Sequence, residues 1–216
     1  MPSHAELICN HLVSGPRSAR QLIENIGLSQ PTISRAITEV GADIVRIGAA
    51  RSIQYALRDR ARGLPDIPVY RVDTAGQIRL LGTLSAVRPE GFVMSGANDL
   101  CQHSDGLPWW LFDMRPQGYL GRAYAACHAA PLGLPARLTD WSDTHALRAL
   151  LAHGHDVVGN LLLGDLARER FLSAATPEPI AEASKAGEYA RLALSAAQGE
   201  QAGSSAGGEH PKFTCY

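Results

Sequence analysis

The amino-acid sequence predicts an α+β fold built in two parts. Apolar residues recur at helical spacing through most of the first 40 residues, whereas residues 44–57 and 67–95 alternate at strand period. Helical spacing returns after residue 143. Helices and strands that are segregated along a chain, in place of a regular alternation, are typical of α+β proteins. The composition, with 45% hydrophobic and 19% charged residues, is that of a globular protein.

Three short helices are predicted near the N-terminus. The first follows from apolar residues at near-helical spacing over residues 5–13. A capping-box pattern that starts at Ser18 begins the second helix, and Gly27 makes the turn that ends it. Ser29 is placed to cap the third helix, and Pro31 lies in its first turn, where a missing N–H group costs nothing. Two helices joined by so short a turn form a helix-turn-helix.

The second helix of this pair begins with polar residues that could face the major groove of DNA. Gln pairs with adenine and Arg with guanine through two hydrogen bonds each, whereas Ser and Thr hold phosphates or contact a thymine methyl group. The strands predicted at 44–47 and 52–57 form a hairpin, or wing, whose arginines would reach a phosphate or the minor groove. The candidate DNA-contacting residues are Ser29, Gln30, Thr32, Ser34, Arg35, Arg46 and Arg51.

Residues 1–60 are therefore predicted to be a winged helix-turn-helix domain that binds double-stranded DNA. The first 62 residues contain eight arginines, no lysine and five acidic residues, so positive charge gathers at this end although the net charge of the chain is -1. Helix-turn-helix proteins commonly bind paired half-sites as dimers, which makes a homodimer a candidate assembly. The alternative is a protein-binding module, because a fold does not fix its function.

A second domain is predicted for residues 65–216, after a linker rich in charge, Gly and Pro at 58–65. Strands at 67–71, 77–84 and 91–95 predict a small antiparallel sheet. Helices are predicted from residue 143 and over residues 180–197. The aromatic stretch Leu107 to Phe112 is interpreted as a core or subdomain contact.

Several kinds of site and location are not expected. No apolar run approaches the ~20 residues that span a bilayer, and the N-terminus lacks the features of a secretion signal, so we expect a cytoplasmic protein without a membrane segment. The four cysteines form no C-x-x-C pair, and the histidines have no metal-ligand spacing, so no metal site is predicted. His153 to Asp156, followed by Asn160, superficially resembles a kinase catalytic loop, but its spacing is one residue too short, and we interpret it as a helix end and turn.

A Gly- and Ser-rich segment occupies residues 199–213. Closely spaced glycines allow backbone amides to approach an anion and form a phosphate-binding nest. The segment is not a Walker A loop, because no Lys follows Gly208, and it lacks the Gly-rich pattern of ordinary protein kinases. The pattern alone favours a flexible tail.

This segment, together with residues 154–162, resembles the N-terminal half of the HipA-type serine/threonine kinases, toxins of toxin-antitoxin pairs. In that family a loop of the form S-x-A-G-A-Q-x-K covers the ATP phosphates, and a serine at its start is autophosphorylated. Residues 204–212 read Ser-Ser-Ala-Gly-Gly-Glu-His-Pro-Lys and match this loop closely. The resemblance covers roughly residues 65–216, and an N-terminal winged helix is similar to the YjjJ-type members of the family.

The resemblance implies a nucleotide phosphate loop and an antitoxin as a possible partner. The implied autophosphorylation site is Ser204 or Ser205. The implied phosphate-loop residues are Ser205, Ala206, Gly207, Gly208 and Lys212. ATP and Mg²⁺ are implied as cofactors once the kinase half is supplied.

The chain also departs from the family. In HipA-type kinases the ATP-contacting lysine strand, the catalytic Asp loop and the metal-binding Asp follow the phosphate loop, whereas this sequence stops at Tyr216. Phosphoryl transfer depends on positioned Mg²⁺ and on a base. We therefore expect no catalytic residue and no cofactor for this chain alone, which looks like a truncated or split product whose C-terminal kinase fragment is a candidate partner.

Three functions follow as hypotheses. The first is a DNA-binding protein, either a transcriptional regulator or a truncated toxin component without kinase activity of its own. The second is the N-terminal part of a serine/threonine protein kinase, active only with the missing C-terminal catalytic half. The third is a module that binds only proteins.

Overall fold

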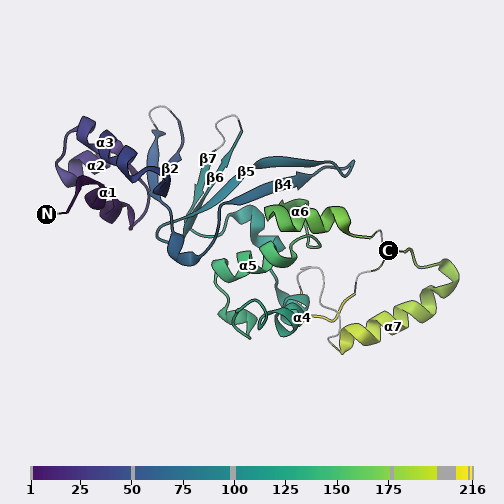
Figure 1. Cartoon of the computed structure of the whole chain (residues 1–216). Helices are drawn as coiled ribbons and strands as arrows, with labels where there is room; N and C mark the ends of the chain where they lie inside the picture. The colour runs from purple at the N-terminus through teal and green to yellow at the C-terminus, as the bar shows by residue number, and fades with distance from the viewer. Residues whose placement is uncertain are drawn as a thin grey trace. The chain divides into compact units, whose positions relative to one another are not determined.

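A computed structural model describes residues 2–49, 52–97, 101–175, 178–198, 208–213 and 215. The chain divides into two compact units. The first contains Met1–Val69 and Leu80–Pro108, and the second contains Tyr70–Arg79 and Trp109–Tyr216. Helices and strands both occur, which confirms the expected mixed α and β composition (Figure 1). The domain boundaries at residues 60 and 65 stay a prediction.

The elements are as follows. The α-helices are α1 (His4–Leu12), α2 (Ala19–Ile26), α3 (Gln30–Val40), α4 (Gly118–His128), α5 (Asp143–His153), α6 (Gly164–Ser173) and α7 (Lys185–Ala197). The strands are β1 (Arg17–Ser18), β2 (Ile44–Ile47), β3 (Gln54–Leu57), β4 (Ile67–Val72), β5 (Ile78–Val87), β6 (Gly91–Gly96), β7 (Cys101–Ser104) and β8 (Leu161–Leu163). Short 3₁₀ helices include η3 (Arg60–Arg62) and η4 (Trp109–Met114).

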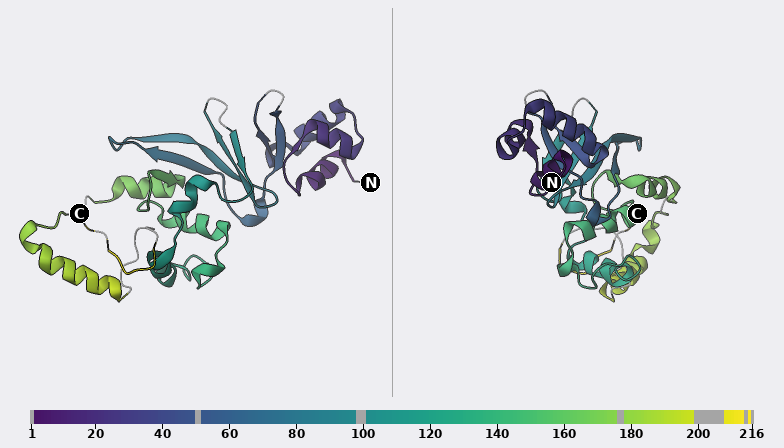
Figure 2. Two further views of the ribbon diagram at one scale, coloured as in Figure 1. Left: turned by 180° about the vertical axis from the view of Figure 1, so that it is seen from behind. Right: turned by 60° about the vertical axis from the view of Figure 1, so that its left-hand side comes forward.

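The first three helices form where the sequence predicts them, and they stay together in every view (Figure 2). Capping boxes begin two of them, at Ser3 before α1 and at the predicted Ser18 before α2, and each satisfies backbone amides that have no partner within the helix. One apolar stripe from each helix meets in a common core. Its buried members are Ile8, Leu12, Leu22, Ile33 and Ala36.

The predicted hairpin follows directly. Strands β2 and β3 pair antiparallel, with Arg46 opposite Tyr55, and β1 adds to the outer side of β3 to give a sheet of order β1-β3-β2. Gly48 has φ 77°, a conformation that side chains rarely adopt, and so begins the turn after β2.

The second sheet has the order β7-β6-β5-β4-β8. The strands predicted at 67–71, 77–84 and 91–95 correspond to β4, β5 and β6. In the turn between β4 and β5, the Asp73 side chain accepts hydrogen bonds from the amides of Ala75 and Gln77. The sequence analysis missed β7, which pairs antiparallel with β6.

The hairpin and the second sheet share a core within the first unit. Val45, Ile47 and Ala56 form one buried cluster with Val87 and Val93. The face of the hairpin that carries these residues is therefore covered by the sheet and is closed to any other ligand.

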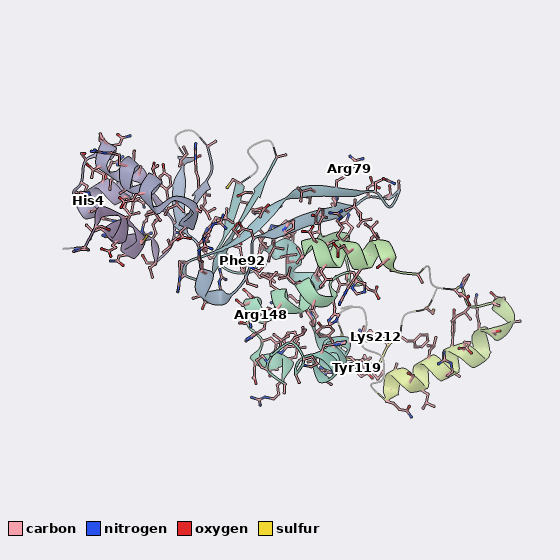
Figure 3. The ribbon with its side chains drawn as sticks, viewed as in Figure 1. His4, Arg79, Phe92, Tyr119, Arg148 and Lys212 are labelled. Carbon is pink, nitrogen blue, oxygen red and sulfur yellow. The ribbon has the colours of Figure 1, made fainter. Side chains whose placement is uncertain are left out.

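The segment at 58–65, interpreted from sequence as a linker, is held by ion pairs. Asp59 is buried and pairs with Arg62 at 3.2 Å and with Arg88 at 3.1 Å. Arg62 donates to the carbonyl oxygens of Val87 and Gly91 and lies over the ring of Phe92, which is labelled on the sheet in Figure 3. The arginines whose charge led us to interpret this segment as a linker thus bind backbone carbonyls and a buried carboxylate.

In the second unit, α5 begins with a capping box at Ser142 and buries Leu147 and Leu150, as the helical spacing predicted. The aromatic stretch is only partly a core element. Leu111 is fully buried in η4, but Trp109 is 71% exposed. Helices α4 and α6 were not predicted.

Candidate functional site

The candidate DNA-contacting residues of α3 lie on one exposed side of this helix. Gln30, Ser34 and Arg35 are exposed, and Thr32 is half-buried. The opposite side of the same helix carries Ile33 and Ala36, which are 1% and 2% exposed and belong to the three-helix core. The helix therefore has a polar side that is open to a ligand and an apolar side that is not.

The turn before α3 has the geometry that the sequence suggests. Gly27 ends α2 with φ 76°, in the left-handed region, and its amide bonds to the carbonyl of Ile23. Ser29 occupies the N-cap position of α3, but its side chain makes no capping hydrogen bond to the helix. The capping role expected for Ser29 is therefore wrong in detail, because its hydroxyl lies 2.9 Å from that of Thr32 instead.

Two of the predicted DNA-contacting residues are arginines that the structure describes. Arg35 donates to the carbonyl of Pro31 at 3.4 Å, and Arg46 is exposed on β2 between the buried Val45 and Ile47. Neither arginine makes an ion pair within the described part of the chain. Arg51, the other predicted wing residue, lies outside the described residues.

The second sheet supports one face of the hairpin formed by β2 and β3. The Cys101 thiol on β7 lies 3.5 Å from the carbonyl oxygen of Arg46, and the apolar cluster around Val45 packs between the two sheets. The backbone of Arg46 is therefore held in place, and its exposed side chain projects from a fixed strand.

The C-terminal segment contains the candidate phosphate loop. Of the residues that the resemblance implies, Ser204, Ser205, Ala206 and Gly207 lie outside the described residues, whereas Gly208 and Lys212 are described. The carbonyl oxygen of Gly208 accepts a hydrogen bond of 2.9 Å from the amide of Tyr119, at the start of α4. Figure 3 labels Tyr119 and Lys212 where this segment meets α4.

The next residue of the segment is also held by α4. The Glu209 carboxylate lies 2.5 Å from Arg122. Gly118 has φ 61°, and a Cβ atom there would collide with the Gly208 carbonyl. The segment and the first turn of α4 therefore fit together only because residue 118 has no side chain.

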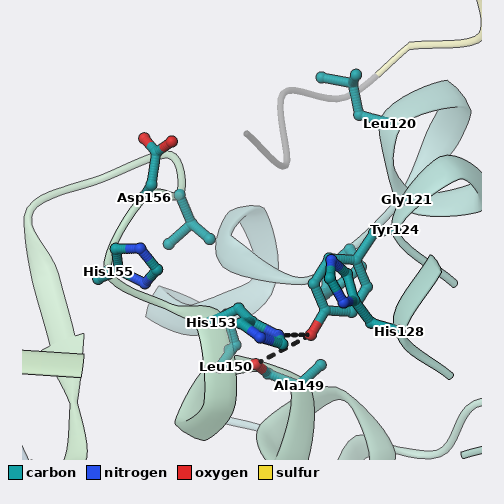
Figure 4. A pocket seen from close by; sticks show the side chains of 11 residues that line it. Leu120, Gly121, Tyr124, His128, Ala149, Leu150, His153, His155 and Asp156 are labelled. Atoms are coloured by element: carbon teal, nitrogen blue, oxygen red, sulfur yellow. Dashed lines mark hydrogen bonds between the residues drawn. The ribbon is translucent and has the colours of Figure 1, made fainter. Parts of the chain in front are cut away.

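A second feature, which we call the histidine pocket, lies between α4 and α5 (Figure 4). It has a volume of about 200 Å³, and its polar lining consists of Tyr124, His128, His153, His155 and Asp156. The Tyr124 hydroxyl lies 2.7 Å from His153 Nδ1, and the ring centroids of His128 and His153 lie 4.4 Å apart with the rings tilted by 39°. His155 Nδ1 is buried and has no hydrogen-bond partner in the described part of the chain.

Burial shifts the pKa values of two side chains in this pocket. It raises the pKa of Tyr124 to about 12, although the charge of Arg170 opposes the shift. It also lowers the pKa of His153, and the neighbouring His128, Arg170 and His155 lower it further. A neutral phenol and a neutral imidazole can form their hydrogen bond without an unpaired charge, so the pair suits the interior of a packed unit.

Among the described residues, no group of three or more His, Cys, Asp or Glu side chains is arranged to hold a metal ion. No helix among them is both long and apolar enough to cross a lipid bilayer.

Comparison with known proteins identifies the family of the chain. Residues 64–172 match the family model described as YjjJ-like toxin, middle domain. The chain belongs to the YjjJ-like toxin family. It is also 40% identical over 206 residues to Toxin YjjJ of Escherichia coli (strain K12), an alignment that covers 95% of this chain and 46% of that protein. The chain thus spans about half the length of this curated relative. No solved structure matches it.

The family match covers the second sheet, the histidine pocket and the start of α4, but it begins after α1 to α3. The alignment with the YjjJ toxin leaves out only a few residues of this chain, so it includes most of those helices. Sequence reasoning missed Tyr119, Arg122 and Tyr124, because α4 itself was not predicted.

Proposed function

We propose that residues 1–60 form a winged helix-turn-helix domain and that this YjjJ-like chain binds double-stranded DNA through it. The observation that carries the proposal is the two-sided character of α3. Its polar residues Gln30, Ser34 and Arg35 are exposed, and its apolar residues are buried against α1 and α2. A helix so oriented, second of a pair and preceded by a tight glycine turn, suits the major groove.

The chemistry of the surface suits a duplex. The Arg35 guanidinium can pair with the two acceptors of guanine, and the Gln30 amide with those of adenine. Arg46 on the wing would neutralise a phosphate and add affinity that depends on salt but carries little sequence information. The role that follows is a transcriptional regulator, or a toxin component without kinase activity of its own.

A binding assay on a selected duplex tests this proposal. Enrichment from a pool of random duplexes should yield a preferred sequence. Arg35→Ala should weaken binding to that sequence by about tenfold, and Gln30→Ala should change the preference at one position. Arg191→Ala, on α7 in the other unit, is the matched control and should bind as the parent does. Absence of any enriched sequence, or equal binding by Arg35→Ala, would contradict the proposal.

We propose that a homodimer binds the duplex, because paired half-sites on DNA match two copies of one DNA-binding domain. Light scattering of the chain with and without the selected duplex tests it. One copy per duplex would refute the dimer without affecting the DNA-binding proposal. If the chain instead binds only protein partners, such as an antitoxin, the duplex assay fails while a partner is retained on affinity chromatography.

A second candidate function is the N-terminal part of a HipA-type serine/threonine kinase. The observation that favours it is the packing of Lys212 against Gly208, where a Cβ atom on the glycine would lie only 2.8 Å from the ammonium nitrogen. A lysine next to a glycine backbone is the pairing that a phosphate loop needs. In this proposal ATP and Mg²⁺ bind when a C-terminal catalytic half is supplied, and Ser204 or Ser205 becomes phosphorylated.

Labelled ATP with Mg²⁺ tests the kinase proposal. The chain alone should yield no labelled product, whereas the chain mixed with the C-terminal half of a YjjJ toxin should yield label that Ser204→Ala or Ser205→Ala removes. Labelling of the chain by itself would overturn the inactivity proposed for it. No labelling in the mixture would count against the kinase.

A further inference from the structure

The second unit contains an arginine-lined cavity that neither proposed function uses. We call it the arginine pocket. It has a volume of about 620 Å³, within the range typical of small-molecule sites, and it lies between the starts of α4 and α5. Its cationic residues are Arg115, Arg122 and Arg137, and the half-buried Trp141 forms part of its wall.

Each of these arginines lies beside one carboxylate. Arg115 lies 3.9 Å from Asp143, and Arg122 lies 2.5 Å from Glu209. Arg137 pairs with Asp140, which is outside the lining of the pocket. Each guanidinium has five N–H donors, of which one carboxylate engages one or two. The three arginines and their three carboxylates together carry no net charge, but N–H donors remain for a ligand, and departure of Glu209 would leave one positive charge without its carboxylate.

The C-terminal segment contributes its oxygen atoms at the edge of this pocket. The Gly208 carbonyl accepts from the Tyr119 amide, and the Glu209 carboxylate pairs with Arg122, one turn along the same helix. Gln117, the N-cap residue of α4, provides no side-chain capping bond. The Gly208 carbonyl oxygen, with its partial negative charge, thus lies at the start of α4, and the negatively charged Glu209 carboxylate lies at Arg122 on the same helix. A helix start and an arginine both attract such groups.

We propose that the arginine pocket binds a phosphate-bearing anion, and that Glu209 is an internal group which this anion displaces from Arg122. A phosphate group carries more charge than one carboxylate and offers oxygens that match the fork of a guanidinium. The site needs neither Mg²⁺ nor a second polypeptide, which separates it from the kinase proposal. It lies in the second unit, so it is also independent of DNA binding by α3.

Calorimetric titration of the full chain with pyrophosphate, without metal, tests the proposal. Saturable binding with a Kd below about 1 mM is expected. Arg122→Gln and Arg137→Gln should each weaken it about tenfold, which corresponds to one charge-assisted contact. Arg191→Gln removes an exposed, ion-paired arginine from α7 and should leave the affinity unchanged.

Two variants test displacement of Glu209 from opposite directions. Glu209→Gln should tighten pyrophosphate binding several-fold, because the competing charge is gone. Gly118→Ala should do the same through sterics, because its Cβ atom meets the Gly208 carbonyl and drives the segment away. Circular dichroism of each variant verifies that it is folded.

Comparing pyrophosphate with a nucleoside monophosphate shows which kind of phosphate ligand the pocket prefers. A nucleoside monophosphate that binds more tightly than pyrophosphate would indicate that Trp141 contacts a base, and equal or weaker binding would indicate an anion site alone; both support the proposal. No binding at millimolar pyrophosphate, or binding by Arg122→Gln and Arg137→Gln as tight as that of the parent protein, would overturn it. Unchanged or weaker binding by folded Glu209→Gln would overturn the displacement.

Discussion

Asp59 and Arg62 form an ion pair at 3.2 Å in which 3% and 12% of the two side-chain surfaces are exposed. The pair follows directly after β3 and lies against β5 and β6, because Arg62 donates to the carbonyls of Val87 and Gly91. A charge so buried is stable only while its partners stay in place. The pair therefore ties the N-terminal helices and hairpin to the sheet in the first unit.

Asp59→Ala should lower the free energy of unfolding of the first unit by about 3 kcal/mol, since it leaves Arg62 and Arg88 without their buried carboxylate. Urea denaturation measures this loss. Asp43→Ala, which removes the exposed partner of Arg60, is the matched control and should cost at most about 1 kcal/mol. Equal losses for the two variants would refute the structural role given to Asp59.

Gly27→Ala should destabilise the three-helix core by about 1 kcal/mol. No atom lies within 4 Å of the added Cβ, so the whole cost comes from the φ of 76°. Gly187→Ala, in α7, also meets no atom, but its backbone is helical, and it should be neutral or slightly stabilising. Thermal denaturation compares the two, and a neutral Gly27→Ala would show that the turn can adopt another conformation.

The stability of the second unit should fall in mild acid. The pKa of His153 is lower in the folded protein than its ordinary value of about 6.5, so the unfolded chain binds the extra proton. The stabilisation is complete above about pH 6.5 and is lost as the pH falls toward the folded pKa. His153→Gln should reduce the dependence of Tm on pH between about 8 and 5. An unchanged slope would show that other groups cause it.

The Tyr124 hydroxyl should lose its proton at a higher pH than an ordinary tyrosine. Its pKa is raised to about 12, so the neutral phenol stabilises the fold below the ordinary pKa of about 10, and this stability is lost as the pH rises through about 12. Ultraviolet titration of tyrosinate should reveal one late group that is absent from Tyr124→Phe. That variant also loses the contact to His153, at a cost of about 1 kcal/mol. A variant curve that overlays the parent curve would place the late ionisation elsewhere.

Local signals made the N-terminal region predictable. The cap at Ser18, the turn at Gly27 and the proline at position 31 act within a few residues, and α2 and α3 form where these signals place them. The exposed side of α3 then follows from helical spacing alone. Nothing local, however, indicated that the arginines after β3 would be bound to the sheet, because a pattern of charge, Gly and Pro is the same in solvated and ion-paired segments.

Helix α4 could not be predicted, because it depends on tertiary contacts. It begins at Gly118 and contains Gly121, and glycine disfavours a helix. The structure needs both glycines: a Cβ atom on Gly121 would lie 2.6 Å from the carbonyl carbon of Pro116. Tyr124 and His128 lie on this helix, so the histidine pocket and the arginine pocket stayed hidden although His153 had been singled out.

The most direct test of the central claim places a photo-crosslinking amino acid at Ser34, on the exposed side of α3, and at Glu188, on α7 in the other unit. Both proteins are irradiated with the selected duplex at low and high salt. DNA contact through α3 predicts a crosslink from position 34 to bases of the preferred site, weaker at high salt, and none from position 188. Equal crosslinking from both positions, or none from position 34, would contradict it.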